Sequence, residues 1–283
     1  MTNAAQASAP AETGRGTRLD VRAVRKAYGG VRAVQDVTLS CGTGEILAVI
    51  GPNGAGKTTL FGLISGDVRC DGGRISLDGR DISALPAARR ARIGLSRTFQ
   101  VAHVMERLTV HENLLLAAAA SAGLALRWTR RAGQPGPAEQ RVAPVAERLD
   151  LVRKAGQLAG GLSQGERKRL DIGMALVQEP RLLLLDEPTA GMGAEDVAAT
   201  TRTLAAIHRE EPDLSMVFTA HDMSVVFGLA QTVALMVDGQ LVMTGTPEQI
   251  RSSPQAQAAY LGQSYAGQQE AGRGTQGRDD SEI

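Results

Sequence analysis

The sequence predicts an α/β protein whose parallel β-sheet is covered by helices on both faces and carries an inserted helical lobe. Strand-like and helix-like patterns alternate along the chain, and the strand-like segments are continuous apolar runs. Continuous apolar strands are typical of parallel sheets that are buried on both faces. A mostly helical pattern over residues 104–178, broken at the QPGP segment 134–137, interrupts the alternation and predicts the lobe.

The elements follow in order between two tails. Residues 1–17 and 263–283 lack periodicity, so we expect them to be disordered and the ordered domain to span 18–262. An alternating segment from Leu19 leads to an apolar strand at Glu45–Ile50, after which a helix begins near Lys57. Further strands are expected at residues 74–79, 93–99, 181–185 and 214–219.

Composition excludes several function classes. The net charge of the 283 residues is only +1, which argues against a nucleic-acid partner. The longest nearly uncharged apolar run, residues 114–126, is shorter than the roughly 20 residues of a spanning helix, so it predicts a buried helix. Residues 1–18 contain no apolar segment typical of a secretory signal.

A phosphate-binding loop is the first motif with a chemical meaning. Residues 51–58 read GPNGAGKT, which matches GxxxxGK[ST] between an apolar strand and a predicted helix. Glycines at this spacing let backbone N–H groups point at phosphate oxygens, while Lys57 reaches the β- and γ-phosphates and the Thr58 hydroxyl binds Mg²⁺. A glycine-rich turn without a ligand is the alternative. The residues expected to bind the nucleotide here are Gly51, Asn53, Gly54, Ala55, Gly56, Lys57, Thr58 and Thr59.

Two carboxylates follow a later apolar strand. Asp186, Glu187 and Pro188 come directly after the run Leu182–Leu185, at the edge where open α/β sheets bind ligands. We assign Asp186 to Mg²⁺ or its water, and Glu187 to the activation of the attacking water as general base. A solvated turn after a core strand is the alternative.

Residues 162–166, LSQGE, open a predicted helix upstream of this step and resemble the signature of the ATP-binding cassette (ABC) ATPases. The resemblance covers nearly the whole ordered chain. It implies a P-loop NTPase (RecA-like) core with a small antiparallel β lobe, a helical subdomain over about residues 101–172, and ATP with Mg²⁺ as cofactors.

The signature also has a local physical meaning. Ser163 followed three residues later by Glu166 predicts a capping box, so the helix begins with exposed N–H groups. The resemblance implies that Ser163, Gly165 and Glu166 bind the γ-phosphate of ATP held by a second cassette, in a head-to-tail homodimer or heterodimer. A plain helix cap is the alternative.

Three more residues receive roles from the resemblance. Tyr28 is implied to stack on adenine, Gln100 to contact Mg²⁺ or the lytic water, and His221 to contact the γ-phosphate and position water. The catalytic set is then Glu187, His221, Gln100 and Lys57, and the metal set Thr58, Gln100 and Asp186. An ordinary tyrosine, loop amide or structural histidine is the alternative at each position.

Some positions depart from the family pattern or lack a motif. Gln164 stands where glycine is most common, and Gly193 stands where many members have an aspartate. The basic clusters 89–92, 127–131 and 167–169 are interpreted as solvated helix faces, with lipid or permease contact as a second possibility for Arg127-Trp128.

Segments 91–100, 108–117 and 245–262 look like those of the cytoplasmic ATPase subunits of bacterial importers for branched-chain amino acids, urea and short amides. This closer resemblance implies a peripheral protein at the cytoplasmic face of the inner membrane. Its implied partners are transmembrane permease subunits, which dock near residues 101–108, and indirectly a periplasmic solute-binding protein. Two alternatives stay open: the ATPase of a lipopolysaccharide-type exporter, and a soluble ABC ATPase of translation or DNA repair.

Overall fold

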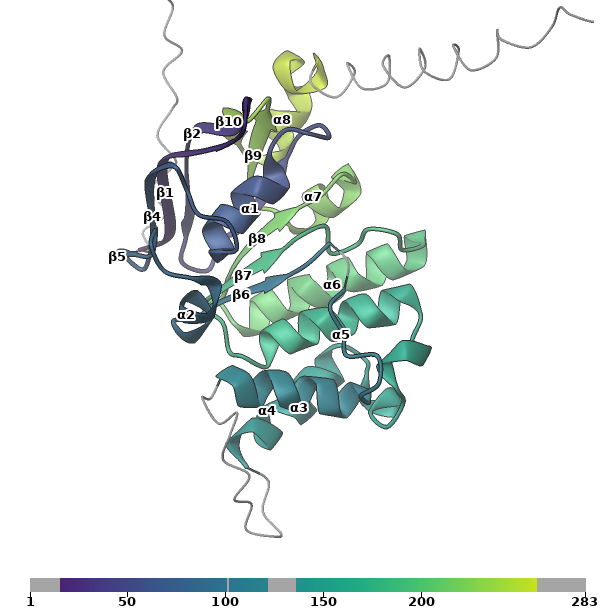
Figure 1. Ribbon diagram of the computed structural model, residues 1–283. Coiled ribbons are helices and arrows are strands. Elements are labelled where there is room, and N and C mark those ends of the chain that lie inside the picture. The colour runs from purple at the N-terminus through teal and green to yellow at the C-terminus, as the bar shows by residue number, and fades with distance from the viewer. Residues whose placement is uncertain (1–15, 101, 122–135, 259–283) are drawn as a thin grey trace, which may run out of the picture.

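The computed structural model describes residues 16–100, 102–121 and 136–258 (Figure 1). Within these ranges the strands form two sheets, with orders β2-β1-β4-β5 and β10-β9-β3-β8-β7-β6. The first sheet is antiparallel and consists of β1 (Thr17–Tyr28), β2 (Val31–Gly42), β4 (Gly72–Leu77) and β5 (Arg80–Asp81). The second contains β3 (Ile46–Ile50), β6 (Leu95–Thr98), β7 (Leu182–Leu185), β8 (Ser215–Thr219), β9 (Thr232–Val237) and β10 (Gln240–Gly245).

The larger sheet is parallel except at one edge. Strands β6, β7, β8, β3 and β9 are parallel neighbours, and only β10 pairs antiparallel, with β9. The predicted α/β class and the antiparallel lobe are therefore confirmed. Because the carboxyl ends of parallel strands meet at one edge, the segments that follow β3, β6, β7 and β8 lie near one another.

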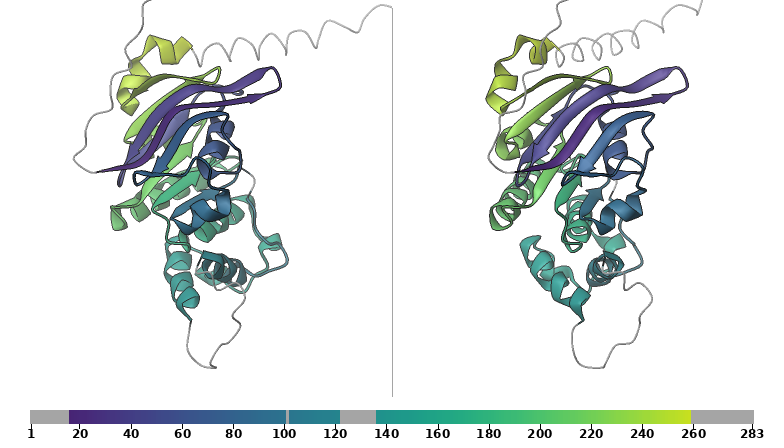
Figure 2. Two further views of the ribbon diagram at one scale, coloured as in Figure 1. Left: turned by 60° about the vertical axis from the view of Figure 1, so that its left-hand side comes forward. Right: turned by 90° about the vertical axis from the view of Figure 1, so that its left-hand side faces the viewer.

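The helices occupy both faces of this sheet (Figure 2). Those before the lobe are α1 (Lys57–Ser65) and α2 (Ala87–Arg92). The lobe contains α3 (Val110–Ser121), α4 (Pro137–Arg148), α5 (Gln164–Leu176) and two short 3₁₀ turns, η1 (Val152–Lys154) and η2 (Ala159–Gly161). Helices α6 (Ala194–Glu210), α7 (Met223–Leu229) and α8 (Pro247–Ser252) follow.

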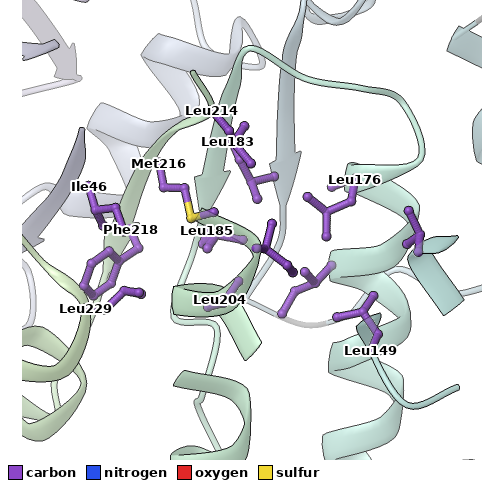
Figure 3. Close-up of a cluster of buried hydrophobic side chains, with 14 of the residues drawn as sticks. Ile46, Leu149, Leu176, Leu183, Leu185, Leu204, Leu214, Met216, Phe218 and Leu229 are labelled. Carbon is purple, nitrogen blue, oxygen red and sulfur yellow. The ribbon is translucent and has the colours of Figure 1, made fainter. Parts of the chain in front are cut away.

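Strand β3 supplies both hydrophobic cores through its alternating side chains. Leu47 and Val49 pack with α1 in a core that lies between the two sheets. Ile46, Ala48 and Ile50 join the core on the opposite face, where the sheet meets α5, α6 and α7 (Figure 3). Each fully buried large apolar side chain contributes about 1.5–3 kcal/mol, so this strand is held rigidly and fixes the loop that follows it.

The lobe lies between β6 and β7, where the helical pattern predicted it. Its helix α5 begins at Gln164 because Ser163 and Glu166 form the expected capping box. The apolar run 114–126 begins inside α3, and its second half lies outside the described residues. None of the described helices has the length and apolarity needed to span a bilayer.

The boundary of the predicted N-terminal tail at residue 17 stays a prediction; Thr17 pairs with Gly42 between β1 and β2, and the carbonyl oxygen of Gly16 accepts a hydrogen bond from the N–H of Thr43. The rest of that tail up to residue 15, and the predicted C-terminal tail 263–283, lie outside the described residues. The basic cluster 127–131 lies outside them as well. The boundary of the helical subdomain at 101–172 stays a prediction.

Candidate functional site

The phosphate loop joins β3 to α1 through backbone conformations that only glycine accepts. Gly51 has φ of 150°, and an added Cβ would lie 2.1 Å from the carbonyl oxygen of Met236. Gly56 has φ of 93°, and its Cβ would lie 2.2 Å from the carbonyl oxygen of Ala33. The loop is therefore held against β2 and β9, and it aims the N-terminus of α1 at the carboxyl edge of the sheet. Asn53 and Gly54 are exposed in the loop, Ala55 is buried, and Thr58 and Thr59 lie in the first turn of α1.

Lys57 is buried within this loop. Its Nζ donates hydrogen bonds to the carbonyl oxygens of Gly51 at 2.7 Å and Pro52 at 2.9 Å. Burial lowers the pKa of Lys57, while the charges of Glu187 and Asp186 raise it and so oppose that shift. The ammonium therefore interacts electrostatically with both carboxylates. A bound anion would stabilise its charge in the same way and offset the cost of burial.

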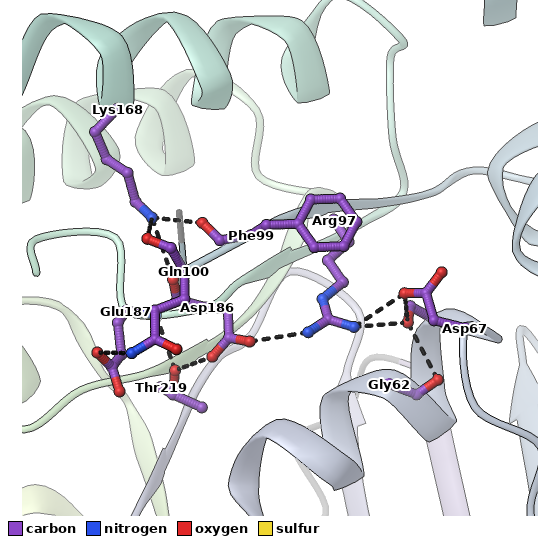
Figure 4. Close-up of polar contacts among 10 residues, drawn as sticks. Gly62, Asp67, Arg97, Phe99, Gln100, Lys168, Asp186, Glu187 and Thr219 are labelled. Carbon is purple, nitrogen blue, oxygen red and sulfur yellow. Dashed lines mark hydrogen bonds and ion pairs between the residues drawn. The ribbon is translucent and has the colours of Figure 1, made fainter. Parts of the chain in front are cut away.

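Asp186 lies just after β7 and is 2% exposed. Its Oδ1 accepts a hydrogen bond from Thr219 Oγ1 at 2.9 Å, and its Oδ2 pairs with Arg97 Nη2 at 2.9 Å (Figure 4). Its carbonyl oxygen accepts from Lys168 Nζ at 3.4 Å. This carboxylate is therefore fixed in orientation by donors from β6 and β8.

Glu187 points toward two side chains at the same edge. Its Oε1 lies 2.8 Å from His221 Nε2, and its Oε2 accepts a hydrogen bond from Gln100 Nε2 at 3.1 Å. Its backbone has φ of 47°, an uncommon conformation for a side chain of this size. The Glu187 N–H donates to Thr219 Oγ1 at 2.9 Å, which holds the strained turn in place.

The register of the sheet explains this convergence. Leu185 pairs with Thr98 of β6 and with Phe218 of β8. The next residues along the three strands are therefore neighbours, and Gln100 and His221 follow them within two positions. The structure thus brings Gln100, Asp186, Glu187 and His221 together from three segments of sequence.

The signature residues form a separate group at the start of α5. The N–H of Glu166 donates to Ser163 Oγ at 3.3 Å, and the N–H of Ser163 donates to Glu166 Oε2 at 2.9 Å. The hydrogen bond from Lys154 is the main cause that lowers the pKa of Glu166. In the part of the chain that the structure describes, the side chains of Ser163 and Glu166 make no hydrogen bond or ion pair with the phosphate loop.

The two departures from the family pattern lie close to this helix. The side chain of Gln164 fills the space beside Gly191, whose added Cβ would lie 2.2 Å from Gln164 Nε2. Gly165 packs against Asp196, since its Cβ would lie 3.1 Å from Asp196 Oδ2. Gly193 is the N-cap of α6 and caps it without a side chain.

Tyr28 is not part of the carboxylate network. It ends β1 at the hairpin to β2, its side chain is 50% exposed, and Lys26 Nζ lies 5.4 Å from the centre of its ring. An exposed ring on a paired strand is suited to stacking on a flat ligand.

The interpretation of the basic clusters as solvated faces is wrong for two residues. Arg90 is 2% exposed and donates to the carbonyl oxygens of Leu63 and Ile64 at the end of α1. Lys168 is 3% exposed and donates to the carbonyl oxygens of Phe99 at 2.6 Å and Gln100 at 3.0 Å. In both side chains, hydrogen bonds to backbone carbonyl oxygens take the place of hydrogen bonds to water, and they offset the cost of burying the cation.

Sequence reasoning also missed Arg97 and Thr219, which hold Asp186. A charged residue within the strand β6 of the parallel sheet is the signal that marks Arg97, because a buried arginine without a partner is rarely tolerated. Thr219 carries no comparable signal, since threonine is common in strands.

Comparisons with known proteins agree with this geometry. The ABC transporter family model matches residues 34–190. The chain is 35% identical over 251 residues to the high-affinity branched-chain amino acid transport ATP-binding protein LivG of Escherichia coli, a match that covers 87% of this chain and 98% of the relative. This chain belongs to the ABC transporter ATP-binding proteins of the branched-chain amino acid family.

Two further comparisons concern branched-chain amino acid transport, and a third concerns an exporter. The model of the branched-chain amino acid ATP-binding cassette transporter family matches residues 240–266 of this ABC ATPase. BraF of Pseudomonas aeruginosa, also a high-affinity branched-chain amino acid transport ATP-binding protein, is 35% identical over 255 residues, which cover 87% of this chain and 98% of BraF. The lipopolysaccharide export ATP-binding protein LptB of Haemophilus influenzae is 33% identical over 240 residues, which cover 85% of this chain and 95% of LptB.

The fold agrees with a solved cassette. MJ1267, an ATP-binding cassette of an ABC transporter in its ADP conformation, superposes with a TM-score of 0.77 at 26% identity, over 87% of this chain and 99% of MJ1267. The chain is therefore an ABC transporter ATPase that binds ATP and couples its hydrolysis to transport.

Proposed function

We propose that this ABC ATPase energises the uptake of branched-chain amino acids, or of a related small solute such as urea or an amide. The observation that carries the proposal is the match of residues 240–266 to the branched-chain amino acid cassette family. The segment begins with β10 and continues into α8, which Thr246, Pro247 and Gln249 start with a capping box and a proline in its first turn. LivG and BraF, which are named as high-affinity branched-chain amino acid transport ATP-binding proteins, match over 87% of the chain.

The proposed nucleotide site lies between the phosphate loop and the carboxylate tip. Residues 51–59 bind the phosphates of ATP, with Lys57 as the cation, and Tyr28 stacks on adenine. Asp186 and Thr58 hold Mg²⁺, and Gln100 contacts it or the lytic water.

The donor set fits Mg²⁺. The described residues contain no group of three or more His, Cys, Asp or Glu side chains that would hold a metal by themselves. Mg²⁺ is usually held by one or two carboxylates together with substrate phosphates and water, which matches a single buried Asp186. When bound, the ion neutralises charge that develops on the transferred phosphoryl group.

The proposed catalytic step uses the network around Glu187. Glu187 takes a proton from the attacking water as general base, and His221 and Gln100 fix the direction of its two carboxylate oxygens. Lys57 stabilises the negative charge on the phosphate oxygens. Because phosphoryl transfer depends mainly on positioning and charge neutralisation, a preassembled carboxylate is the main requirement.

The site is completed by a second cassette in this proposal. Ser163, Gly165 and Glu166 lie at the N-terminus of α5, whose exposed N–H groups and positive dipole end attract a phosphate. Among the described residues, Ser163 and Glu166 have no hydrogen bond or ion pair with the phosphate loop of the same chain. This supports a role toward the ATP of a partner cassette, which is a copy of this chain or a sister cassette.

The remaining partners follow from the importer assignment. Transmembrane permease subunits dock at the lobe near residues 102–108, where Met105 is 41% exposed, and a periplasmic solute-binding protein delivers the solute to them. The ATPase then works at the cytoplasmic face of the inner membrane.

Uptake measurements test the proposed function. In the organism that encodes the chain, Glu187→Gln should abolish the uptake of radiolabelled leucine, isoleucine and valine that depends on this gene, while Glu195→Gln, which changes an exposed carboxylate, should not. Loss of urea or amide uptake instead would assign the related solute. Unchanged uptake of all these solutes, with a defect in lipopolysaccharide export, would overturn the importer assignment in favour of an LptB-like role.

A further inference from the structure

Arg97 holds an uncommon position for an arginine. It lies on the short strand β6, at the edge of the larger sheet, yet its side chain is only 9% exposed. Its guanidinium lies between two structures that the nucleotide site needs, the carboxylate of Asp186 and the C-terminal end of α1. The ring of Phe99, which directly follows β6, lies 5.0 Å from the guanidinium carbon and covers it.

The contacts of Arg97 join these two structures. Nη2 pairs with Asp186 Oδ2 at 2.9 Å, while Nη1 lies 3.0 Å from both Ser65 Oγ and Asp67 Oδ2. Ser65 is the last residue of α1, and its hydroxyl donates to Asp67 Oδ2 at 2.6 Å and lies 3.2 Å from the carbonyl oxygen of Gly62. One side chain therefore connects the end of the phosphate-loop helix to the acidic tip of β7.

Arg90 provides a contrast in the same region. The hydrogen bonds of Arg90 go to backbone carbonyl oxygens, namely those of Leu63, Ile64, Leu85 and Ser83, as expected for an arginine that only stabilises the fold. The acceptors of Arg97 are side chains, two of them carboxylates, and its Nε has no hydrogen-bond partner among the described residues. A buried guanidinium with an unsatisfied N–H lowers the stability of the fold, so we expect a gain in function that offsets this cost.

The gain is the orientation of Asp186. A carboxylate held by one donor turns about its Cβ–Cγ bond, whereas donors on both oxygens fix its plane. Thr219 holds Oδ1 and Arg97 holds Oδ2. We propose that Arg97 is a positioning residue, which fixes the Asp186 carboxylate relative to the phosphate-loop helix so that it meets the nucleotide-bound divalent cation without reorganisation. Partners that orient a metal-binding carboxylate typically change metal affinity or activity by about 10–100-fold when they are removed.

The proposal rests on the assignment of Asp186 to the metal, and the test separates the two. The full chain is kept in excess over a non-hydrolysable ATP analogue, so that all the nucleotide is bound, and Mn²⁺ is added as the probe. Free Mn²⁺ is followed by electron paramagnetic resonance. Arg97→Gln should raise the Mn²⁺ concentration at half-saturation about tenfold, while the affinity for the analogue in EDTA stays within about twofold. Arg92→Gln, at an exposed arginine of α2, is the matched control and should change neither quantity.

Two further variants make the outcome decisive. Arg97→Lys keeps the positive charge, but its single ammonium does not reach both Asp186 and Asp67. The Mn²⁺ concentration at half-saturation should therefore lie between those of the wild type and Arg97→Gln. Asp67→Asn removes the outer anchor, which is 37% exposed, and should cause a smaller rise in the same direction; it decides the question if Arg97→Gln does not fold. If the Mn²⁺ concentration at half-saturation in these variants is equal to or below that of the wild type, the role of Arg97 is overturned. If Asp186→Asn also leaves Mn²⁺ binding unchanged, the assignment of Asp186 itself is wrong.

Discussion

His221 Nε2 lies 2.8 Å from Glu187 Oε1. The two side chains, which follow the neighbouring strands β8 and β7, are therefore in contact within the chain itself. Gln100 occupies the other oxygen of the same carboxylate. The three residues come from separate segments, and the strand register alone brings them together. A general base that is already oriented needs little rearrangement when ATP and water enter.

Glu187→Gln should keep ATP binding and lower turnover by about 10²–10⁴-fold, the usual contribution of a general base. The amide keeps the shape of the side chain but does not accept a proton at neutral pH. Steady-state ATPase rates and equilibrium ATP binding measure the two effects, and gel filtration with ATP should show the variant as a dimer. Ordinary turnover by this variant would remove Glu187 from the base role.

Arg90→Met should lower the free energy of unfolding by about 3 kcal/mol or more, because hydrogen bonds to charged groups contribute about 1.5–3 kcal/mol each. Four carbonyl oxygens near α1 lose their donor. Urea denaturation measures the change. Arg92→Met, on the same helix but exposed, should change stability little, and equal losses in both variants would contradict the structural role.

Lys168→Met should lower the free energy of unfolding by about 1–3 kcal/mol, the cost of leaving buried polar groups unsatisfied. Its ammonium joins α5 to the carbonyl oxygens of Phe99 and Gln100, so the loss should also raise hydrogen exchange in the segment after β6. Arg153→Met is the exposed control in the same lobe. Unchanged exchange near Gln100 would show that Lys168 does not anchor that segment.

The stability of the chain should depend on pH through Asp171. Burial raises the pKa of this carboxyl above its ordinary value, and the opposing effects of Lys168 and His103 are smaller. The fold therefore favours the protonated form, so the contribution of Asp171 to stability is full below its ordinary pKa and is lost as pH rises through the raised value. Relative to the wild type, Asp171→Asn should gain stability over that pH interval.

Denaturation of both proteins at pH values from about 3.5 to 7 measures this difference. Asp213→Asn removes an exposed carboxyl and is the control. A difference between Asp171→Asn and the wild type that does not change with pH would contradict the effect of burial.

The sequence predicted the parts of the site that lie next to recognisable turns. Gly51, Lys57, Asp186 and His221 follow apolar strands, and a parallel sheet places the ends of its strands at one edge. It did not predict which cations are buried. Four lysines and 27 arginines provide many basic residues, and nothing local separates Arg90 from Arg92.

What distinguishes the buried cations is long-range. Arg97 reaches Asp186 because β6 pairs with β7, although 89 positions separate the two residues. Lys168 is buried because α5 packs against the segment after β6. These contacts depend on the assembled sheet and lobe, so local periodicity contains no information about them.

A crystal structure of Glu187→Gln with ATP and Mg²⁺ tests the central claim most directly. We expect the triphosphate on residues 51–58, the ion between Thr58 and Asp186, and Ser163 of a second cassette at the γ-phosphate. A nucleotide bound elsewhere, or an ion with no contact to Asp186 directly or through water, would contradict the account.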